Sequence, residues 1–130
     1  MIDVNEFQPE LVGRGQWHVF HTLSSKADSY EQREMVKWVI ITCINNLRCQ
    51  ICFEHATNYL KKHPIEKSLS SKESLFLYLY NFHSAANEYA GKTSPSYEEV
   101  KEFYFNNNQK CTKTCGKNKK IGEVKNYVDI

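Results

Sequence analysis

Three features that define large classes of proteins are missing from this sequence of 130 residues. Its net charge is only +2, so charge gives no reason to expect a nucleic-acid or membrane partner. Its longest apolar run, Val36 to Ile44, is interrupted by Lys37 and is too short to cross a bilayer. The first residues are partly acidic and have no apolar core, so we expect no signal peptide and a cytoplasmic location.

Regular alternation of apolar and polar residues is also missing, which argues against a β-sheet. Apolar residues recur at spacings of three and four instead, and the length is that of one domain. We therefore predict an all-α fold, a four-helix bundle plus a short fifth helix, because short loops between amphipathic helices favour a bundle. The expected helices cover residues 10–25, 30–46, 48–62, 74–90 and 97–105, between an irregular segment 1–9 and a mobile tail 106–130.

Local signals indicate where these helices begin and end. Asp28 or Ser29 can cap the second helix, and Ser70 with Glu73 fits a capping box before the fourth, which Gly91 ends. The second helix has the broadest apolar stripe, on which we expect Cys43 to be a small buried hydrophobic residue. The stripe consists of Met35, Val36, Val39, Ile40, Cys43, Ile44 and Leu47.

Five cysteines leave one residue over after two close pairs, Cys49 with Cys52 and Cys111 with Cys115. Close pairs are typical of exchangeable dithiols or metal ligands rather than of bridges between distant segments. At a helix start, Cys49 and Cys52 share one face, and the free N–H groups of the first turn favour thiolate. His55, three residues further on, leaves zinc binding open as the alternative to redox chemistry.

Two further helices each present a polar or aromatic pair four residues apart, which places both members on the same face. Any one such pair is more often packing than a ligand site. If the faces converge, however, they supply an aromatic wall, hydrogen-bonding groups and a cation, which suit a large planar cofactor with phosphates. The pairs are Trp17 with His21, preceded by Arg14, and His83 with Asn87, followed by Lys92.

These motifs, in this order, resemble those of the Erv/ALR family of FAD-linked sulfhydryl oxidases. Residues 13–22 resemble the family's opening Gly-Arg-x-x-Trp-x-x-x-His-Thr, and the Cys-x-x-Cys follows after one intervening helix. Residues 83–87 resemble His-Asn-x-Val-Asn, and Gly91-Lys92 resembles the Gly-Lys after it. The likeness covers about residues 11–105 and is greatest to members encoded by large DNA viruses.

The resemblance implies a helical bundle with FAD in its mouth, usually as a homodimer, and no metal. Cys52 would face the flavin, and Cys49 would face incoming thiols. The cofactor would be bound by Gly13, Arg14, Trp17, His21, His55, His83, Asn87 and Lys92.

The implied activity is the formation of disulfides in protein substrates. Electrons would pass from a protein dithiol or a thioredoxin-like carrier through Cys49 and Cys52 to FAD, and then to O2, giving H2O2. Cys111 and Cys115 would act as a shuttle pair. For the protein as a whole, we expect no nucleic-acid partner and no membrane partner. For a viral protein, the expected location is the host cytoplasm or the virion assembly site. The alternative is a small zinc-stabilised interaction module that uses Cys49, Cys52, His55 and a tail cysteine.

The sequence departs from the family pattern at a few positions. Ser84 replaces the first asparagine of His-Asn-x-Val-Asn, and Ala86 replaces its valine. Arg48 stands where proline often precedes the Cys-x-x-Cys. Tyr80 stands where animal members have one cysteine of a second, structural disulfide, so that disulfide is not expected here.

Overall fold

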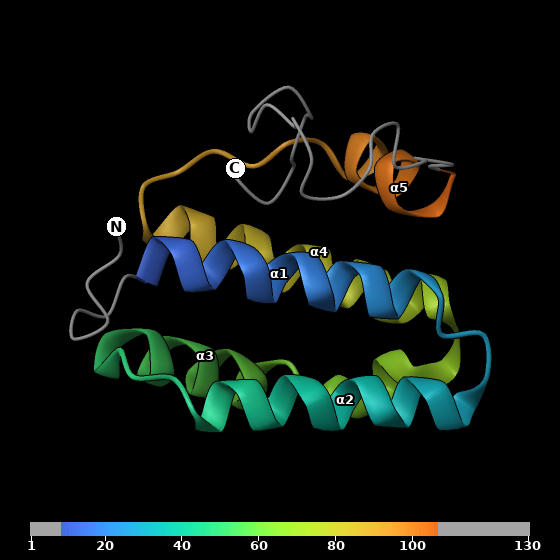
Figure 1. Ribbon diagram of the computed structural model, residues 1–130, viewed down its shortest axis with the longest axis horizontal. Helices are drawn as coiled ribbons and strands as arrows, with labels where there is room; N and C mark the ends of the chain where they lie inside the picture. The colour runs from blue at the N-terminus through green and yellow to red at the C-terminus, as the bar shows by residue number, and fades with distance from the viewer. Residues whose placement is uncertain (1–8, 107–130) are drawn as a thin grey trace, which may run out of the picture.

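The structure, a computed structural model that describes residues 9–106, is an up-and-down bundle of four helices with a fifth helix outside it (Figure 1). Successive bundle helices run in opposite directions, and α5 lies against α1 and α4, on the side away from α2 and α3. No strand occurs in the described part, so the all-α prediction is confirmed. The elements are α1 (Pro9–Ser25), α2 (Tyr30–Asn45), α3 (Gln50–Lys62), the 3-10 helix η1 (Ile65–Ser70), α4 (Lys72–Tyr89) and α5 (Tyr97–Phe105).

Serine side chains begin three of these helices. Ser29 starts α2 with a reciprocal capping box, in which its Oγ accepts the Gln32 N–H at 3.1 Å and Gln32 Oε1 accepts the Ser29 N–H at 3.0 Å. Ser96 Oγ accepts the Glu99 N–H at the start of α5. The cap of α4 is Ser71, whose Oγ accepts the Ser74 N–H at 3.0 Å.

The predicted capping box of Ser70 with Glu73 is therefore wrong by one residue. The loop expected before α4 is largely the six-residue helix η1, which ends at Ser70 and leaves Ser71 as the extended residue before α4. Gly91 follows the end of α4 with φ of 75°, a left-handed conformation that glycine adopts without strain. The remaining helix limits lie within two residues of those predicted.

The core lies between the two layers of helices and is apolar. Its most deeply buried side chains come from α2, η1 and α4, and α1 adds Phe20. On α2 the buried stripe is narrower than predicted, because Met35 points outward and is 67% exposed, and Cys43 is only half-buried. Val36 follows Met35 by one residue, a turn of about 100° on a helix, and faces inward. The fully buried apolar residues of this core are Ile40, Leu69, Leu75 and Leu79, whereas the equally buried Phe76 packs against aromatic residues of α5.

A buried arginine that the sequence did not reveal links three parts of the fold. Arg33 on α2 donates from Nε to the carbonyl oxygen of Leu69 at 2.7 Å. Its Nη1 donates to the carbonyl oxygens of Ala27 and Asp28, each at 3.0 Å. The guanidinium thus joins α2 to the end of η1 and to the turn between α1 and α2.

Some predictions concern residues outside the described range. They are the irregular segment before Pro9, the mobile tail and the shuttle pair Cys111 with Cys115. Among the described helices, none is both long enough and apolar enough to span a bilayer.

Candidate functional site

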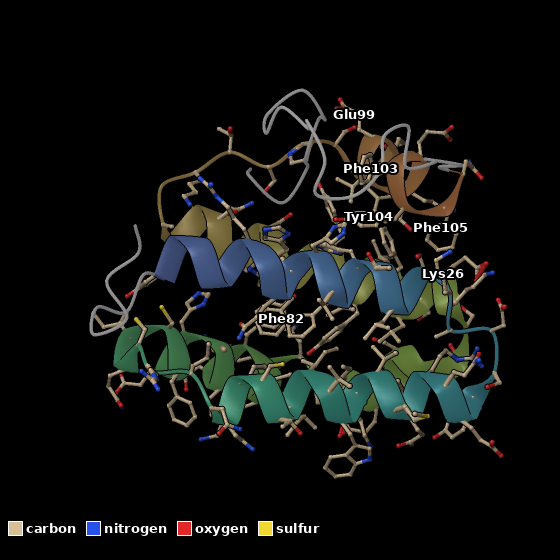
Figure 2. The ribbon with its side chains drawn as sticks, in the orientation of Figure 1. Lys26, Phe82, Glu99, Phe103, Tyr104 and Phe105 are labelled. Carbon is tan, nitrogen blue, oxygen red and sulfur yellow. The ribbon has the colours of Figure 1, made fainter. Side chains whose placement is uncertain are left out.

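Stacked aromatic and histidine rings, called the wall below, join α1 to α4. The rings of Trp17 and His83 are parallel to within 4°, with centroids 4.3 Å apart. Phe82 meets the Trp17 ring edge-on at 5.2 Å and lies between the two layers of helices (Figure 2). Trp17 and His21 are one turn apart on α1, so the spacing seen in the sequence brings both residues to α4.

His21, which is buried, and His83, which is half-buried, form a pair of neutral imidazoles. His21 Nε2 and His83 Nδ1 are 2.9 Å apart and share one hydrogen bond. Burial lowers the pKa of His21 to about 3, and the nearby His83 and His18 lower it further. Burial also lowers the pKa of His83 to about 4, with a contribution from the charge of Lys92. Both rings are therefore uncharged at neutral pH.

The second nitrogen of His21 is the clearest indication that this wall receives a ligand. His21 is only 2% exposed, and its buried Nδ1 has no hydrogen-bond partner among the described residues. Leaving a buried polar atom unsatisfied costs about 1–3 kcal/mol. A polar group of a bound molecule would recover that free energy.

Tyr104 on α5 is a component of this site that sequence reasoning missed. Its hydroxyl is 3.0 Å from His18 Nδ1, and its ring centroid is 5.2 Å from that of His21. Figure 2 shows Tyr104 pointing from α5 toward α1. The only signal in the sequence was the aromatic run 103–105, which does not indicate a contact with a residue 86 positions earlier.

A small pocket beside the histidine pair is closed by the segment between α4 and α5. Asn87 Nδ2 donates to Ser94 Oγ at 3.0 Å, and the Tyr80 hydroxyl donates to the carbonyl oxygen of Pro95 at 2.5 Å. These bonds hold the segment against α4. The pocket is lined largely by polar and aromatic side chains, from His21, Tyr80, His83, Ser84, Asn87, Ser94, Pro95, Val100 and Tyr104.

Cys49 and Cys52 form a contacting pair of thiols at the start of α3. Cys49 is the N-cap residue, and its Sγ accepts the Cys52 N–H at 3.3 Å and the Cys52 thiol at 2.6 Å. These two hydrogen bonds lower the pKa of Cys49. Burial, and then the neighbouring Cys49, raise the pKa of Cys52 to about 11. The negative charge of the reduced pair therefore lies on Cys49.

The pair lies at the same end of the bundle as the start of α1 and the end of α4 (Figure 1). His55, one turn into α3, has its ring centroid 4.5 Å from that of Tyr89 at the end of α4. No three metal-binding side chains gather among the described residues. Cys49, Cys52 and His55 therefore do not form a metal-ligand group there, which disfavours the zinc alternative.

The predicted cofactor residues are not all brought together to the same degree. Trp17, His21 and His83 are in direct contact, and Asn87 lines the small pocket together with the two histidines. For the remaining residues, the assignment to the cofactor stays a prediction. Lys92 is exposed just beyond α4, Arg14 is exposed on α1, Gly13 is half-buried near the start of α1, and His55 contacts α4 through Tyr89.

Comparisons with known proteins agree with this arrangement. The model of the Erv1 / Alr family matches residues 14–119, most of the chain. FAD-linked sulfhydryl oxidases of two isolates of African swine fever virus are 31% and 28% identical over 88 residues, which are 67% of this chain and 71% of each relative. A putative FAD-linked sulfhydryl oxidase of Invertebrate iridescent virus 3 is 25% identical over 99 residues, 74% of this chain and 67% of that protein. With the wall, the histidine pair and the dithiol in the matched region, the chain belongs to the Erv1/Alr family.

Proposed function

We propose that this protein is an FAD-linked sulfhydryl oxidase that makes disulfide bonds in protein substrates, with O2 as electron acceptor and H2O2 as product. The observation that carries the proposal is a contacting dithiol at a helix N-terminus, in a bundle whose helices α1 and α4 are joined by the wall of Trp17 and His83. Membership of the Erv1/Alr family and relatives named for this activity support it.

The residues present fit FAD by their chemistry. Trp17 and His83 stack face to face, so an outer ring face is available to a planar group, and His21 Nδ1 is a buried polar atom without a hydrogen-bond partner among the described residues. Arg14 and Lys92 would neutralise phosphate charge, as exposed cations do. When bound, FAD accepts electrons from a dithiol and passes them to oxygen.

The dithiol pair does the exchange chemistry. In the oxidised pair, a substrate thiolate attacks Cys49 Sγ, the Cys49–Cys52 bond breaks, and Cys52 leaves as thiolate. The second substrate thiolate then attacks its own chain's sulfur in the mixed disulfide and releases Cys49. The two hydrogen bonds from Cys52 to Cys49 Sγ stabilise this released thiolate. The substrate loses two electrons in the exchange, and the pair gains them.

Purified holoprotein tests the proposal directly. We expect it to be yellow and to consume O2 with dithiothreitol while releasing H2O2. Cys52→Ser should abolish this turnover but keep the colour, because the wall is intact. Cys43→Ser is the matched control and should retain turnover, because Cys43 is a half-buried cysteine outside the exchanging pair. A colourless protein that loses its fold with a chelator would contradict the proposal.

We also propose that the protein is a homodimer that buries the outer face of α2. On that face Met35 is 67% exposed and Trp38 is 58% exposed, and because they are three residues apart on α2 they are neighbours on the surface. Met35→Lys combined with Trp38→Ser should shift the protein to monomers in analytical ultracentrifugation. Leu77→Ser, on α4, should leave the mass unchanged; an unchanged mass in the double variant would contradict the assigned face.

The tail cysteines are proposed to pass electrons from protein substrates to Cys49. Cys115→Ala should therefore slow oxidation of a reduced protein several-fold and leave dithiothreitol oxidation unchanged. An equal loss with both substrates would remove the shuttle role.

A further inference from the structure

The end of the bundle that carries the dithiol also exposes two large side chains that the described fold leaves uncovered. Ile51 is 60% exposed in the first turn of α3, between the two cysteines in the chain. Tyr89 is 65% exposed in the last turn of α4. The exposed Ile51 side chain buries little apolar surface, so it does not stabilise the described fold. A polar residue could occupy this position equally well.

The spacing of residues on α3 and one ring contact place these two side chains on either side of His55. Ile51 and His55 are four residues apart, so they are neighbours on the same face of α3. The Tyr89 ring lies against that of His55, with centroids 4.5 Å apart. His55 thus lies between Ile51 and Tyr89, and it is three residues beyond Cys52.

We propose that Ile51 and Tyr89 form the docking surface for the substrate polypeptide, which inserts an apolar side chain beside its reactive cysteine. The proposal rests on the proposed oxidase function, because the exchange step requires a protein thiol to reach Cys49 Sγ. Any polypeptide held there lies over the residues next to Cys49. The exposed side chains of Arg48 and Glu54 nearby carry opposite charges.

Because of this surface, the affinity of the enzyme for a polypeptide depends on the side chain next to the substrate cysteine. The exchange itself is the one described above: the substrate thiolate bonds to Cys49 Sγ, Cys52 leaves as thiolate, and the second substrate thiol completes the disulfide. Dithiothreitol carries no neighbouring side chain, so it undergoes the same exchange without the surface. Ile51 should therefore affect the KM of polypeptide dithiols and not that of dithiothreitol.

Two Cys-x-x-Cys peptides that differ only in a leucine or a serine beside the first cysteine test this on the full-length holoenzyme. The wild type should have a KM about five-fold or more lower for the leucine peptide, the size expected from partly burying one aliphatic side chain. Ile51→Ser should abolish that preference, with kcat/KM for dithiothreitol unchanged, and Ile51→Val should restore it. Tyr89→Ser should weaken the preference without loss of bound flavin.

Leu77→Ser is the control, because this exposed residue is twelve positions before Tyr89, about 18 Å along α4. It should leave the preference intact. Equal KM values of the two peptides with the wild type, or an unchanged preference in Ile51→Ser, would overturn the proposal. If Tyr89→Ser loses its flavin, Tyr89 binds the cofactor and is not part of the docking surface for the substrate. Failure of the oxidase function itself is recognised separately, by a wild type that does not oxidise dithiothreitol.

Discussion

At the scale of single residues, the hydrogen-bonded pair of His21 and His83 makes stability depend on pH. Both pKa values lie below the ordinary value of 6.5, at about 3 and about 4. Between about pH 3 and 6.5 the unfolded chain therefore binds more protons than the folded chain, so the free energy of unfolding falls as the pH falls. The stabilisation is complete above pH 6.5 and is lost as the pH approaches 3.

We expect each of the two histidines to cost the apoprotein on the order of 3 kcal/mol of stability between pH 7 and pH 4. Guanidinium unfolding at a series of pH values measures it. His21→Gln should flatten the pH dependence, whereas His63→Gln, at an exposed position, should not. A His21→Gln curve parallel to that of the wild type would show that the pair does not control the acid sensitivity.

Tyr104 gives a second prediction at the residue scale. Its hydroxyl bonds to His18 and holds α5 next to His21, so we expect it to slow the escape of FAD. Tyr104→Phe should speed FAD release roughly three- to ten-fold, the equivalent of one hydrogen bond, as followed by flavin fluorescence. Tyr97→Phe is the matched control, because Tyr97 is on the same helix and its hydroxyl has no hydrogen bond with the described residues. Equal release rates in both variants would contradict the role of Tyr104.

At the scale of elements, α2 owes its position to Arg33 as well as to its apolar stripe. Three short bonds to backbone carbonyl oxygens satisfy this buried cation without a carboxylate. Arg33→Met should lower the free energy of unfolding by about 2–4 kcal/mol, because it leaves those carbonyl groups without donors inside the fold. Arg48→Met, at an exposed position, should change it by less than about 0.5 kcal/mol. Chemical denaturation of both variants compares them, and equal stabilities would refute the role of Arg33.

The elements also show which parts of the fold the sequence could predict. The five α-helices followed from spacings of three and four and from local signals such as Ser29 and Gly91, because these depend on neighbouring residues alone. Helix η1 and its effect on Ser70 were missed, since a short 3-10 turn has no amphipathic period. Met35 was wrongly placed in the core, because the sequence does not show which residues of a broad apolar stripe are buried and which lie at its exposed margin.

At the scale of the whole molecule, the sequence predicted those contacts of the site that are made by residues spaced four apart on one helix. Trp17, His21 and His83 converge as expected, because residues four apart on one helix must face the same way. Tyr104 and Arg33 were not foreseen. The contact of Tyr104 depends on how α5 lies against α1, and a buried arginine that bonds only to carbonyl oxygens has no pattern in the sequence.

The account depends most on electrons passing from the dithiol of α3 to a flavin held by α1 and α4. Anaerobic addition of dithiothreitol to the holoprotein, with the visible flavin band recorded over time, tests this most directly. The wild type should lose the band rapidly. Cys52→Ser should keep it, because Cys49 alone cannot form the disulfide that delivers two electrons. Bleaching of Cys52→Ser at the wild-type rate would contradict the account.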